Sequence, residues 1–186
     1  MSRVFMAVYP PAEVREHFKR MVDGLAVARP REKSVRLAPP ERWHLTVAFI
    51  GDVEDEDAAV EALLEVGEAE APTVRIAGGK TLGRKQFKHL VAEVESDDGG
   101  IALRRLGDAV RKALRRRRLP FDRRDWQPHL TIARPGQLVG AEELAMDLEH
   151  LAAYRSPEWR LDEVRLMRSR LGPQPEYDVI RTVGLR

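Results

Sequence analysis

Two short stretches of this chain repeat one pattern that is typical of a β-strand. Residues 43–51 and 128–136 each contain histidine, leucine, threonine and a β-branched residue in that order, within an apolar run that a glycine closes. Side chains alternate between the two faces of a strand, so each copy places histidine and threonine on one face. The sequence therefore predicts two strands that are anchored through one face and present an imidazole and a hydroxyl on the other.

The polar residues of the two copies are the strongest candidates for a functional site. They are His44 and Thr46 in the first copy and His129 and Thr131 in the second, so the copies lie 85 residues apart (129 − 44). One copy alone fits a structural histidine beside a threonine that β propensity favours. Propensity gives no reason for histidine to occur twice in the same register. We therefore expect two half-sites that face one cleft.

Two convergent imidazoles suit general acid–base catalysis. The unperturbed pKa of histidine is about 6.5, so near neutral pH one imidazole can be neutral and the other protonated. The neutral ring removes a proton from a nucleophile, and the charged ring gives a proton to a leaving oxygen. Threonine hydroxyls can donate hydrogen bonds to the non-bridging oxygens of a phosphate. The two histidines lack the spacing of common metal motifs, so we expect no metal and no other cofactor.

Composition excludes several classes of protein. The 186 residues include no cysteine, which excludes disulfides, thiolate catalysis and cysteine-ligated zinc and fits a cytoplasmic protein. No stretch approaches the roughly 20 apolar residues that cross a bilayer, and we expect no signal peptide. Basic residues gather after residue 100, above all at 115–118 and 123–124. Those two clusters fit either a solvated helix end or electrostatic attraction of an RNA terminus.

The rest of the pattern predicts strands and helices in alternation. Helical spacing of apolar residues predicts helices over 12–27, 58–69, 101–118 and 141–153. Alternation and β-branched residues predict strands over 3–9, 43–50, 73–77, 89–95, 128–134, 159–170 and 177–183. A polar segment at 78–88 separates two of these strands. Each half of the chain thus holds a strand–helix unit and one histidine motif.

Beyond the two motifs, the chain resembles the two-histidine (HxTx) phosphoesterase superfamily, and within it the RNA 2′,3′-cyclic phosphodiesterase family, also called 2′-5′ RNA ligase. The resemblance runs nearly end to end and rests on residues 3–8, 44–51, 128–134 and 166–169 and on Tyr177. It implies an α+β fold, with one bilobal domain over residues 1–186. Two antiparallel sheets would face a central cleft, with helices on their outer faces. The segment 83–90 departs from the family because it lacks a Phe-Pro turn and a following aromatic residue.

The resemblance also implies a reaction and a role for each motif residue. The reaction is metal-independent hydrolysis of RNA 2′,3′-cyclic phosphate ends to 2′-phosphates, with reversible 2′-5′ RNA ligation as a second activity. His129 would be the base that activates water, and His44 the acid that protonates the 3′ oxygen. Thr46 and Thr131 would hold the phosphate.

Two further residues carry over from the family. They are Phe49 and Arg134, which each follow their histidine by five positions. In the family these positions sandwich the nucleobase, which fits stacking on an aromatic ring and on a guanidinium plane. Simple strand alternation instead predicts that both point away from the histidines. For Phe49, a place in the hydrophobic core is the alternative.

Two other functions remain open at this point. One is a cyclic phosphodiesterase of small nucleotides, such as a cyclic phosphate of ADP-ribose. The other is a non-catalytic RNA-binding protein. For the favoured function we expect RNA or oligonucleotide ends as the partner. We expect no membrane contact, no obligate protein partner and a monomer.

Overall fold

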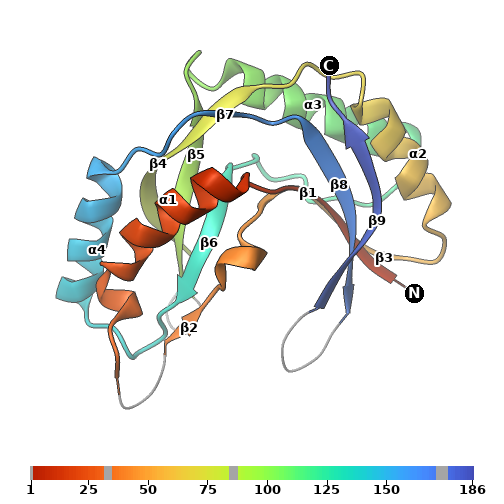
Figure 1. Cartoon of the computed structure of the whole chain (residues 1–186). Coiled ribbons are helices and arrows are strands. Elements are labelled where there is room, and N and C mark those ends of the chain that lie inside the picture. Colours follow the sequence, from red (N-terminus) through yellow and green to blue (C-terminus); the bar gives the residue numbers. More distant parts are fainter. Residues whose placement is uncertain (1, 32–34, 84–87, 171–175) are drawn as a thin grey trace.

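The strands of the chain form two antiparallel sheets that stand as two lobes (Figure 1). The computed structural model describes residues 2–31, 35–83, 88–170 and 176–186. The sheet built around β1, here the β1 sheet, has the order β3 (Leu45–Val53), β1 (Ser2–Val8), β8 (Glu163–Arg170) and β9 (Glu176–Gly184). The second, here the β5 sheet, has the order β2 (Arg36–Leu37), β6 (His129–Arg134), β5 (His89–Ser96), β4 (Thr73–Leu82) and β7 (Trp159–Arg160).

The helices lie against the sheets, and one of them contacts a strand of each sheet. α2 (Asp57–Val66) and α3 (Ile101–Arg116) contact the strands of the β1 sheet, and α4 (Ala141–Ala153) contacts β4. α1 (Ala12–Asp23) lies on the same side of the molecule as α4 (Figure 1). Two short 3-10 turns, η1 (Ala26–Ala28) and η2 (Pro40–Arg42), follow α1. The α+β class with two antiparallel sheets, expected from the family resemblance, is confirmed.

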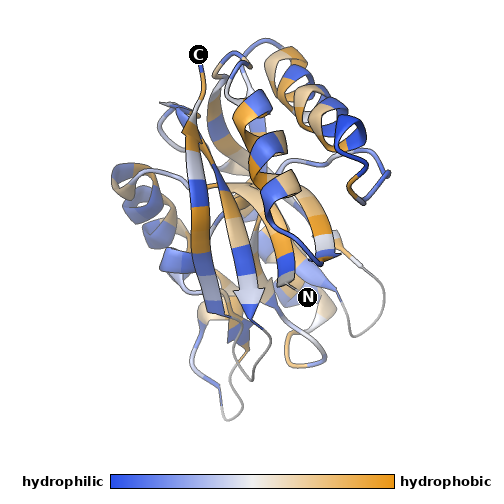
Figure 2. Cartoon of the chain, turned by 90° about the vertical axis from the view of Figure 1, so that its right-hand side faces the viewer, coloured by the Kyte–Doolittle hydropathy of each residue, from blue (hydrophilic) through white to orange (hydrophobic). Residues whose placement is uncertain are grey.

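The two faces of the β1 sheet bury different sets of residues. Val4, Met6 and Val8 of β1 belong to the main core, which also takes in the inner residues of the β5 sheet. Phe5 and Ala7 alternate with them and belong to a small separate cluster on the opposite face. On the strands nearest the viewer, Figure 2 shows instead an alternation of hydrophobic and hydrophilic residues. β1 is therefore apolar on both faces, and its second apolar face is available to build a site.

The segment 159–170 does not form the single long strand that the sequence predicts. Trp159 and Arg160 pair with β4, whereas residues from Glu163 onward pair with β1 and β9. Between them the chain leaves one sheet and enters the other, and Leu161 donates its backbone N–H to the carbonyl of Pro72. The apolar spacing along this segment is irregular because its two ends face different sheets.

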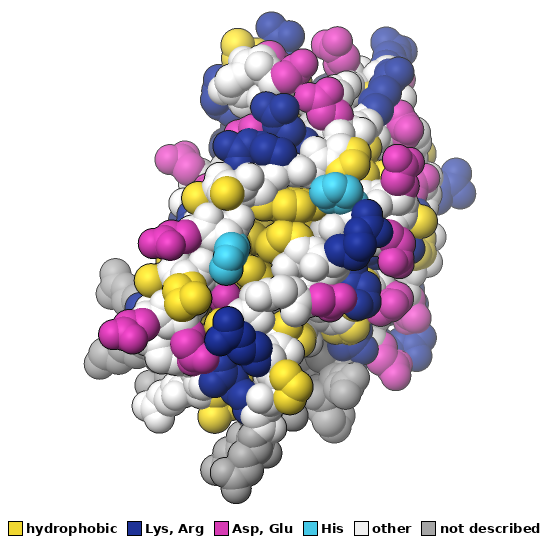
Figure 3. Space-filling view, turned by 60° about the vertical axis from the view of Figure 1, so that its left-hand side comes forward, with side chains coloured by type: hydrophobic (Ala, Val, Ile, Leu, Met, Phe, Trp, Pro, Cys, Tyr) yellow, Lys and Arg dark blue, Asp and Glu magenta, His cyan; other side chains and the backbone are white. Residues whose placement is uncertain are grey.

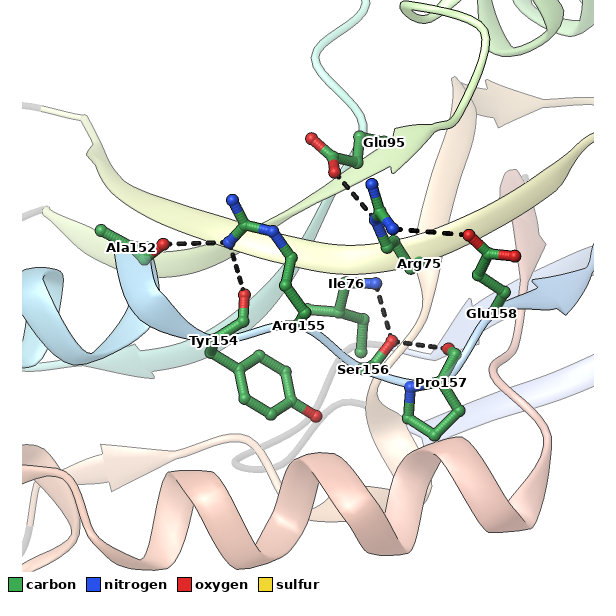
Figure 4. A network of polar contacts seen from close by, with 9 residues as sticks. All are labelled: Arg75, Ile76, Glu95, Ala152, Tyr154, Arg155, Ser156, Pro157 and Glu158. Atoms are coloured by element: carbon green, nitrogen blue, oxygen red, sulfur yellow. Dashed lines mark hydrogen bonds and ion pairs between the residues drawn. The ribbon is translucent and has the colours of Figure 1, made fainter.

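A network of polar contacts holds the chain to β4 just before this crossover (Figure 4). Ser156 Oγ accepts a hydrogen bond from the backbone N–H of Ile76 at 2.9 Å and donates to the carbonyl of Pro157 at 2.8 Å. Arg75 of β4 pairs with Glu95 of β5 at 2.9 Å and with Glu158 at 3.4 Å. The network fixes where β7 begins and hence where the chain turns toward the other sheet.

Two further predicted boundaries are wrong. The first predicted helix extends to residue 27, but α1 ends at Asp23. The next residues form η1, because the buried carboxylate of Asp147 accepts the backbone N–H groups of Ala26 and Val27 at 2.5 and 3.0 Å. The predicted polar segment 78–88 is strand as far as Leu82, with a register shift between Ile76 and Gly79. Residues 84–87 lie outside the described residues.

No helix among the described residues is long and apolar enough to cross a membrane.

Candidate active site

The two histidine motifs meet where the two sheets adjoin. The first motif lies at the start of β3 and the second along β6, and these two strands contact each other. The indole of Trp126, three residues before His129, donates a hydrogen bond to the backbone carbonyl of Thr46 at 2.8 Å. A charge on His129 also lowers the pKa of His44. The structure therefore brings together the two half-sites that the sequence predicts.

The two imidazoles are held in the same way. His44 Nδ1 lies 2.7 Å from the backbone carbonyl oxygen of Arg42, and His129 Nδ1 lies 2.5 Å from that of Gln127. In both motifs the acceptor is the residue two positions earlier. Because a carbonyl oxygen only accepts, each Nδ1 carries the hydrogen and donates it. Each Nε2 is then left to accept a proton in the neutral ring or to give one in the charged ring.

Aromatic side chains surround His44. The ring centroids of Phe5, Tyr9 and Tyr177 lie 5.3 to 5.6 Å from the centroid of the imidazole. The rings of Phe5 and Tyr177 also contact each other, with centroids 5.2 Å apart. Burial among them lowers the pKa of His44, the hydrogen bond to Arg42 raises it, and the charge of His129 lowers it further. His44 therefore lies in an apolar wall of the site.

Charged side chains surround His129 instead. Its cross-strand partner on β5 is Glu93, whose carboxylate pairs with Lys80 of β4 at 2.7 Å. Burial lowers the pKa of His129, and the hydrogen bond to Gln127 raises it. The charge of Lys80 lowers this pKa and the charge of Glu93 raises it. The two histidines thus share a tautomer but differ in their surroundings.

The two threonines share the face of their histidines. Thr46 lies opposite Ala7 of β1, which belongs to the same face as Phe5, and Thr131 lies opposite Val91 of β5. Both side chains are half-buried. Among the described residues, no side-chain or backbone partner forms a hydrogen bond with either hydroxyl. Each hydroxyl is therefore available to a ligand that enters between the motifs.

A β-bulge turns Phe49 back toward the histidine. Ala7 lies opposite Thr46 and Met6 opposite Ala48, so Val47 is an extra residue on β3. Phe49 then lies opposite Phe5, and directly paired residues share a face of the sheet. Phe49 is 44% exposed, with the guanidinium carbon of Arg3 5.7 Å from its ring centroid. The alternation-based prediction for Phe49, and the core alternative, are both wrong.

A bulge at the equivalent position turns Arg134. Thr131 lies opposite Val91 and Ala133 opposite Leu90, so Ile132 is an extra residue on β6. Ala133 and Leu90 are buried on the other face, and Arg134 returns to the face of His129. Both bulges lie three positions after the histidine. The duplicated motif therefore includes a duplicated bulge, which corrects the alternation-based prediction for Arg134 as well.

A cavity of about 660 Å³ opens beside the aromatic wall. Tyr9 lines it together with Arg15 of α1, Arg160 of β7 and Arg165 of β8. The guanidinium of Arg165 lies over the ring of Tyr9, 5.1 Å from its centroid. The site thus has neighbouring space that is bordered by both sheets.

Three of the six arginines at 115–118 and 123–124 form ion pairs within the described part of the chain. Arg117 pairs with Glu61 and Glu65 of α2 at 2.6 Å, and Arg124 pairs with Asp122 at 2.5 Å. On the face that Figure 3 shows, acidic and basic side chains are interspersed and apolar side chains gather in a hollow at its centre. Arg115, Arg118 and Arg123 have no ion pair among the described residues, so a solvated helix end and attraction of RNA both stay open for these clusters.

Sequence reasoning missed four residues that line the site. Lys80 and Glu93 flank His129, and Phe5 and Tyr9 flank His44. Phe5, Lys80 and Glu93 lie on strands that pair with a motif strand or with its neighbour, and Tyr9 directly follows β1. No local pattern in the chain shows which strands pair. The only available signal was the alternation of Phe5 and Ala7 along the first strand, which is apolar on both faces.

Comparisons with a family model and with curated proteins agree on one family. A family model described as the 2′-5′ RNA ligase superfamily matches residues 10–173. Two curated proteins named RNA 2′,3′-cyclic phosphodiesterase are similar over nearly the whole chain. The Geobacillus stearothermophilus protein is 27% identical over 99% of this chain, and the Methanothermobacter thermautotrophicus protein is 28% identical over 92%. The chain spans 57% of the first relative's length and 91% of the second's.

A solved structure supports the same fold. The crystal structure of a Thermus thermophilus protein superposes with a TM-score of 0.72 at 25% identity, covering 99% of this chain and 98% of that one. The two lobes, with antiparallel sheets and helices outside them, are thus found in a relative of nearly equal length.

Proposed function

Because the chain belongs to the 2′-5′ RNA ligase superfamily, we propose that it hydrolyses RNA 2′,3′-cyclic phosphate ends to 2′-phosphates by paired histidine acid–base catalysis. Water attacks the phosphorus, and His129 Nε2 takes a proton from that water. The bond between phosphorus and the 3′ oxygen breaks, and His44 Nε2 gives a proton to this oxygen. Solvent then returns both rings to their starting protonation states.

The observation that carries the proposal is the matched orientation of the two imidazoles. Each Nδ1 is committed to a backbone carbonyl two residues earlier, so each ring acts through Nε2. An in-line displacement needs a base and an acid on opposite sides of the phosphorus, and two convergent rings with equivalent free nitrogens meet that need. The names of the two curated relatives support the same reaction class.

The remaining motif residues fit parts of the substrate. Thr46 and Thr131 present free hydroxyls on the faces of the two histidines, where they can bind the non-bridging phosphate oxygens. Phe49 belongs to the β1 sheet and Arg134 to the β5 sheet. In each strand the bulge turns this residue to the face of the histidine. An exposed ring and a guanidinium plane can then hold a nucleobase between them.

The site also fits transfer of the cyclic phosphate to a hydroxyl group rather than to water. If the 5′-hydroxyl of a second RNA strand takes the place of water, the same proton movements form a 2′-5′ linkage and release the 3′-hydroxyl. The superfamily description supports this second activity. For both activities we propose that the chain works as one bilobal domain in the cytoplasm, as a monomer and without a metal or other cofactor.

A product assay tests the proposed function. An oligonucleotide with a 2′,3′-cyclic phosphate end is incubated with the protein in excess EDTA, and the position of the product phosphate is determined. We expect turnover that EDTA does not inhibit and a product with a 2′-phosphate and a 3′-hydroxyl. Tight, salt-sensitive binding without turnover would instead indicate an RNA-binding protein. Turnover confined to the cyclic phosphate of ADP-ribose would indicate the small-nucleotide alternative.

The pH profile of kcat/KM is expected to move in opposite directions in two variants. The base must be neutral to act, so the acidic limb of the profile follows the pKa of His129 in the free enzyme. Lys80 lowers this pKa and Glu93 raises it. The Lys80→Gln variant therefore shifts the acidic limb to higher pH, and the Glu93→Gln variant shifts it to lower pH.

Lys112→Gln is the matched control for this pair of variants, because Lys112 is exposed on α3 and does not contribute to the pKa of His129. Its profile is expected to coincide with that of the wild type. Shifts of the same sign in Lys80→Gln and Glu93→Gln would contradict the role of His129 as the base.

A further inference from the structure

A row of basic side chains crosses the β5 sheet beside the second motif. Arg36 of β2 lies directly opposite Arg134 of β6. On the other side of β6, Ala133 lies opposite Leu90 of β5. Arg134 follows Ala133 and His89 precedes Leu90, so Arg134 and His89 lie next to each other on the other face of the sheet. Arg36, Arg134 and His89 therefore follow one another across three adjacent strands. We call this set the basic row.

The bulge at Ile132 is what puts the basic row on the face of His129. Ala133 and Leu90 are buried toward the core, so their outward neighbours must point to the opposite face. The charges of Arg134 and His129 both lower the pKa of His89, after the larger effect of its burial, which places the row within electrostatic reach of the catalytic histidine. Without the bulge, Arg134 would face the other side of the sheet.

No carboxylate within the described ranges forms an ion pair with Arg36 or Arg134. Most other arginines of the β-sheets have such a partner, among them Arg3, Arg75, Arg165 and Arg168. Like charges that lie directly opposite on neighbouring strands destabilise a sheet. Both arginines are exposed. Two neighbouring guanidinium groups that have no carboxylate partner within the described residues can bind one anion together, which would offset their mutual repulsion.

The two walls of the site therefore differ in chemistry. The wall around His44 offers aromatic rings, from Phe5, Tyr9 and Phe49. The wall around His129 offers hydrogen-bond donors and positive charge. A terminal nucleotide has one aromatic part, the base, and its only link to the preceding nucleotide is a charged phosphodiester. A cyclic mononucleotide without a 5′-phosphate has no second anion to place on the basic row while its cyclic phosphate lies between the histidines, whereas an oligonucleotide end has one.

We propose that the basic row binds the phosphodiester between the cyclic-phosphate nucleotide and the nucleotide before it, and so selects oligonucleotide ends over cyclic mononucleotides. The inference rests on the proposed function of the site. A guanidinium can bind two phosphate oxygens at once, and Arg36 is free to do so. His89 adds a ring N–H donor. Arg134 can donate from its edge while its plane contacts the base.

The test compares three substrates. They are a cyclic mononucleotide, a dinucleotide with a 2′,3′-cyclic phosphate end, and the same dinucleotide with an uncharged methylphosphonate as its internal linkage. One charge-assisted hydrogen-bonding contact corresponds to about a tenfold change in affinity. We expect kcat/KM of the wild type to be about tenfold higher for the natural dinucleotide than for either of the other substrates.

Variants separate the row from other effects on the site. In Arg36→Gln, and in Arg36→Gln combined with His89→Leu, we expect the preference for the natural linkage over the methylphosphonate to fall to within about twofold. Arg36→Lys keeps the charge but loses bidentate geometry, so it should retain part of the preference. Arg105→Gln is the matched control, since Arg105 is exposed on α3. It should keep the full preference.

The outcomes distinguish this inference from the proposed function. If the wild type turns over all three substrates equally well, the basic row does not bind the phosphodiester, while the proposed function stands. If it turns over none of them, the proposed function fails. Binding of a dinucleotide with a 3′-phosphate end, measured by calorimetry, still tests the row in that case. An equal Kd for the wild type and Arg36→Gln would overturn the inference.

Discussion

Replacing His129 with asparagine is expected to lower kcat/KM for a cyclic-phosphate oligonucleotide by about 10²- to 10⁴-fold, the usual contribution of a general acid or base. The side-chain amide of asparagine can still donate to the carbonyl of Gln127, where Nδ1 now donates. It has no group at the position of Nε2. The variant therefore removes the proton acceptor while retaining the contact that orients it. The same argument applies to His44→Asn, with the carbonyl of Arg42 as the partner.

Combining the two substitutions is expected to cost little more than either alone. The base and the acid serve one transition state, and residues that act as a unit show strongly non-additive effects. His150→Asn is the matched control, because His150 is exposed on α4 and away from both motifs. Rates are compared after thermal unfolding has shown that all variants are folded. Turnover near the wild-type rate in either single variant would exclude the paired mechanism.

The second large effect concerns the threonines. Thr131→Val keeps the shape and β-branching of the side chain but removes the hydroxyl, and we expect kcat to fall about 10²-fold. A hydrogen bond to a non-bridging oxygen strengthens as negative charge develops there, so the loss should appear in kcat rather than in KM. Thr46→Val should behave in the same way, since its hydroxyl also lacks a partner within the described residues.

Thr131→Ser and Thr73→Val are the controls for this prediction. Serine retains the hydroxyl and should retain most of the activity. Thr73 is an exposed threonine at the start of β4, and its replacement tests the general effect of valine on a strand. A change in KM alone for Thr131→Val would indicate ground-state binding and would contradict the role in the transition state.

The placement of Phe49 and Arg134 shows where sequence reasoning reached its limit. The family resemblance assigned both to the substrate, while strand alternation assigned both to the opposite face. Alternation fails because Val47 and Ile132 are bulged, and a bulge reverses the face of the residues that follow it up to the next register shift. A bulge depends on the partner strand as well as on its own residues. Nothing in the two apolar runs by themselves shows that one residue is extra.

The charged residues around His129 likewise depend on which strands pair. Lys80 and Glu93 are ordinary polar residues on predicted or partly predicted strands, and only the pairing of β4, β5 and β6 brings them to the imidazole. Arg36 becomes relevant only because β2 pairs with β6. After burial and the hydrogen bond to Gln127, the charges of Lys80 and Glu93 adjust the pKa of His129. In our proposal, Arg36 contributes to selecting the length of the substrate.

The sequence by itself determined that His44 and Thr46, and likewise His129 and Thr131, share a face, because side-chain alternation within three residues is a local property of an extended chain. It also determined that two such half-sites exist. The tertiary structure alone decided that the segment 159–170 contributes a strand to each sheet. It also decided that aromatic rings line one half-site and charged side chains the other. It further decided that the bulges turn Phe49 and Arg134 toward the face of the histidine in their own strand. The physical reason is that strand pairing, register and bulges are set by contacts between segments far apart in the chain.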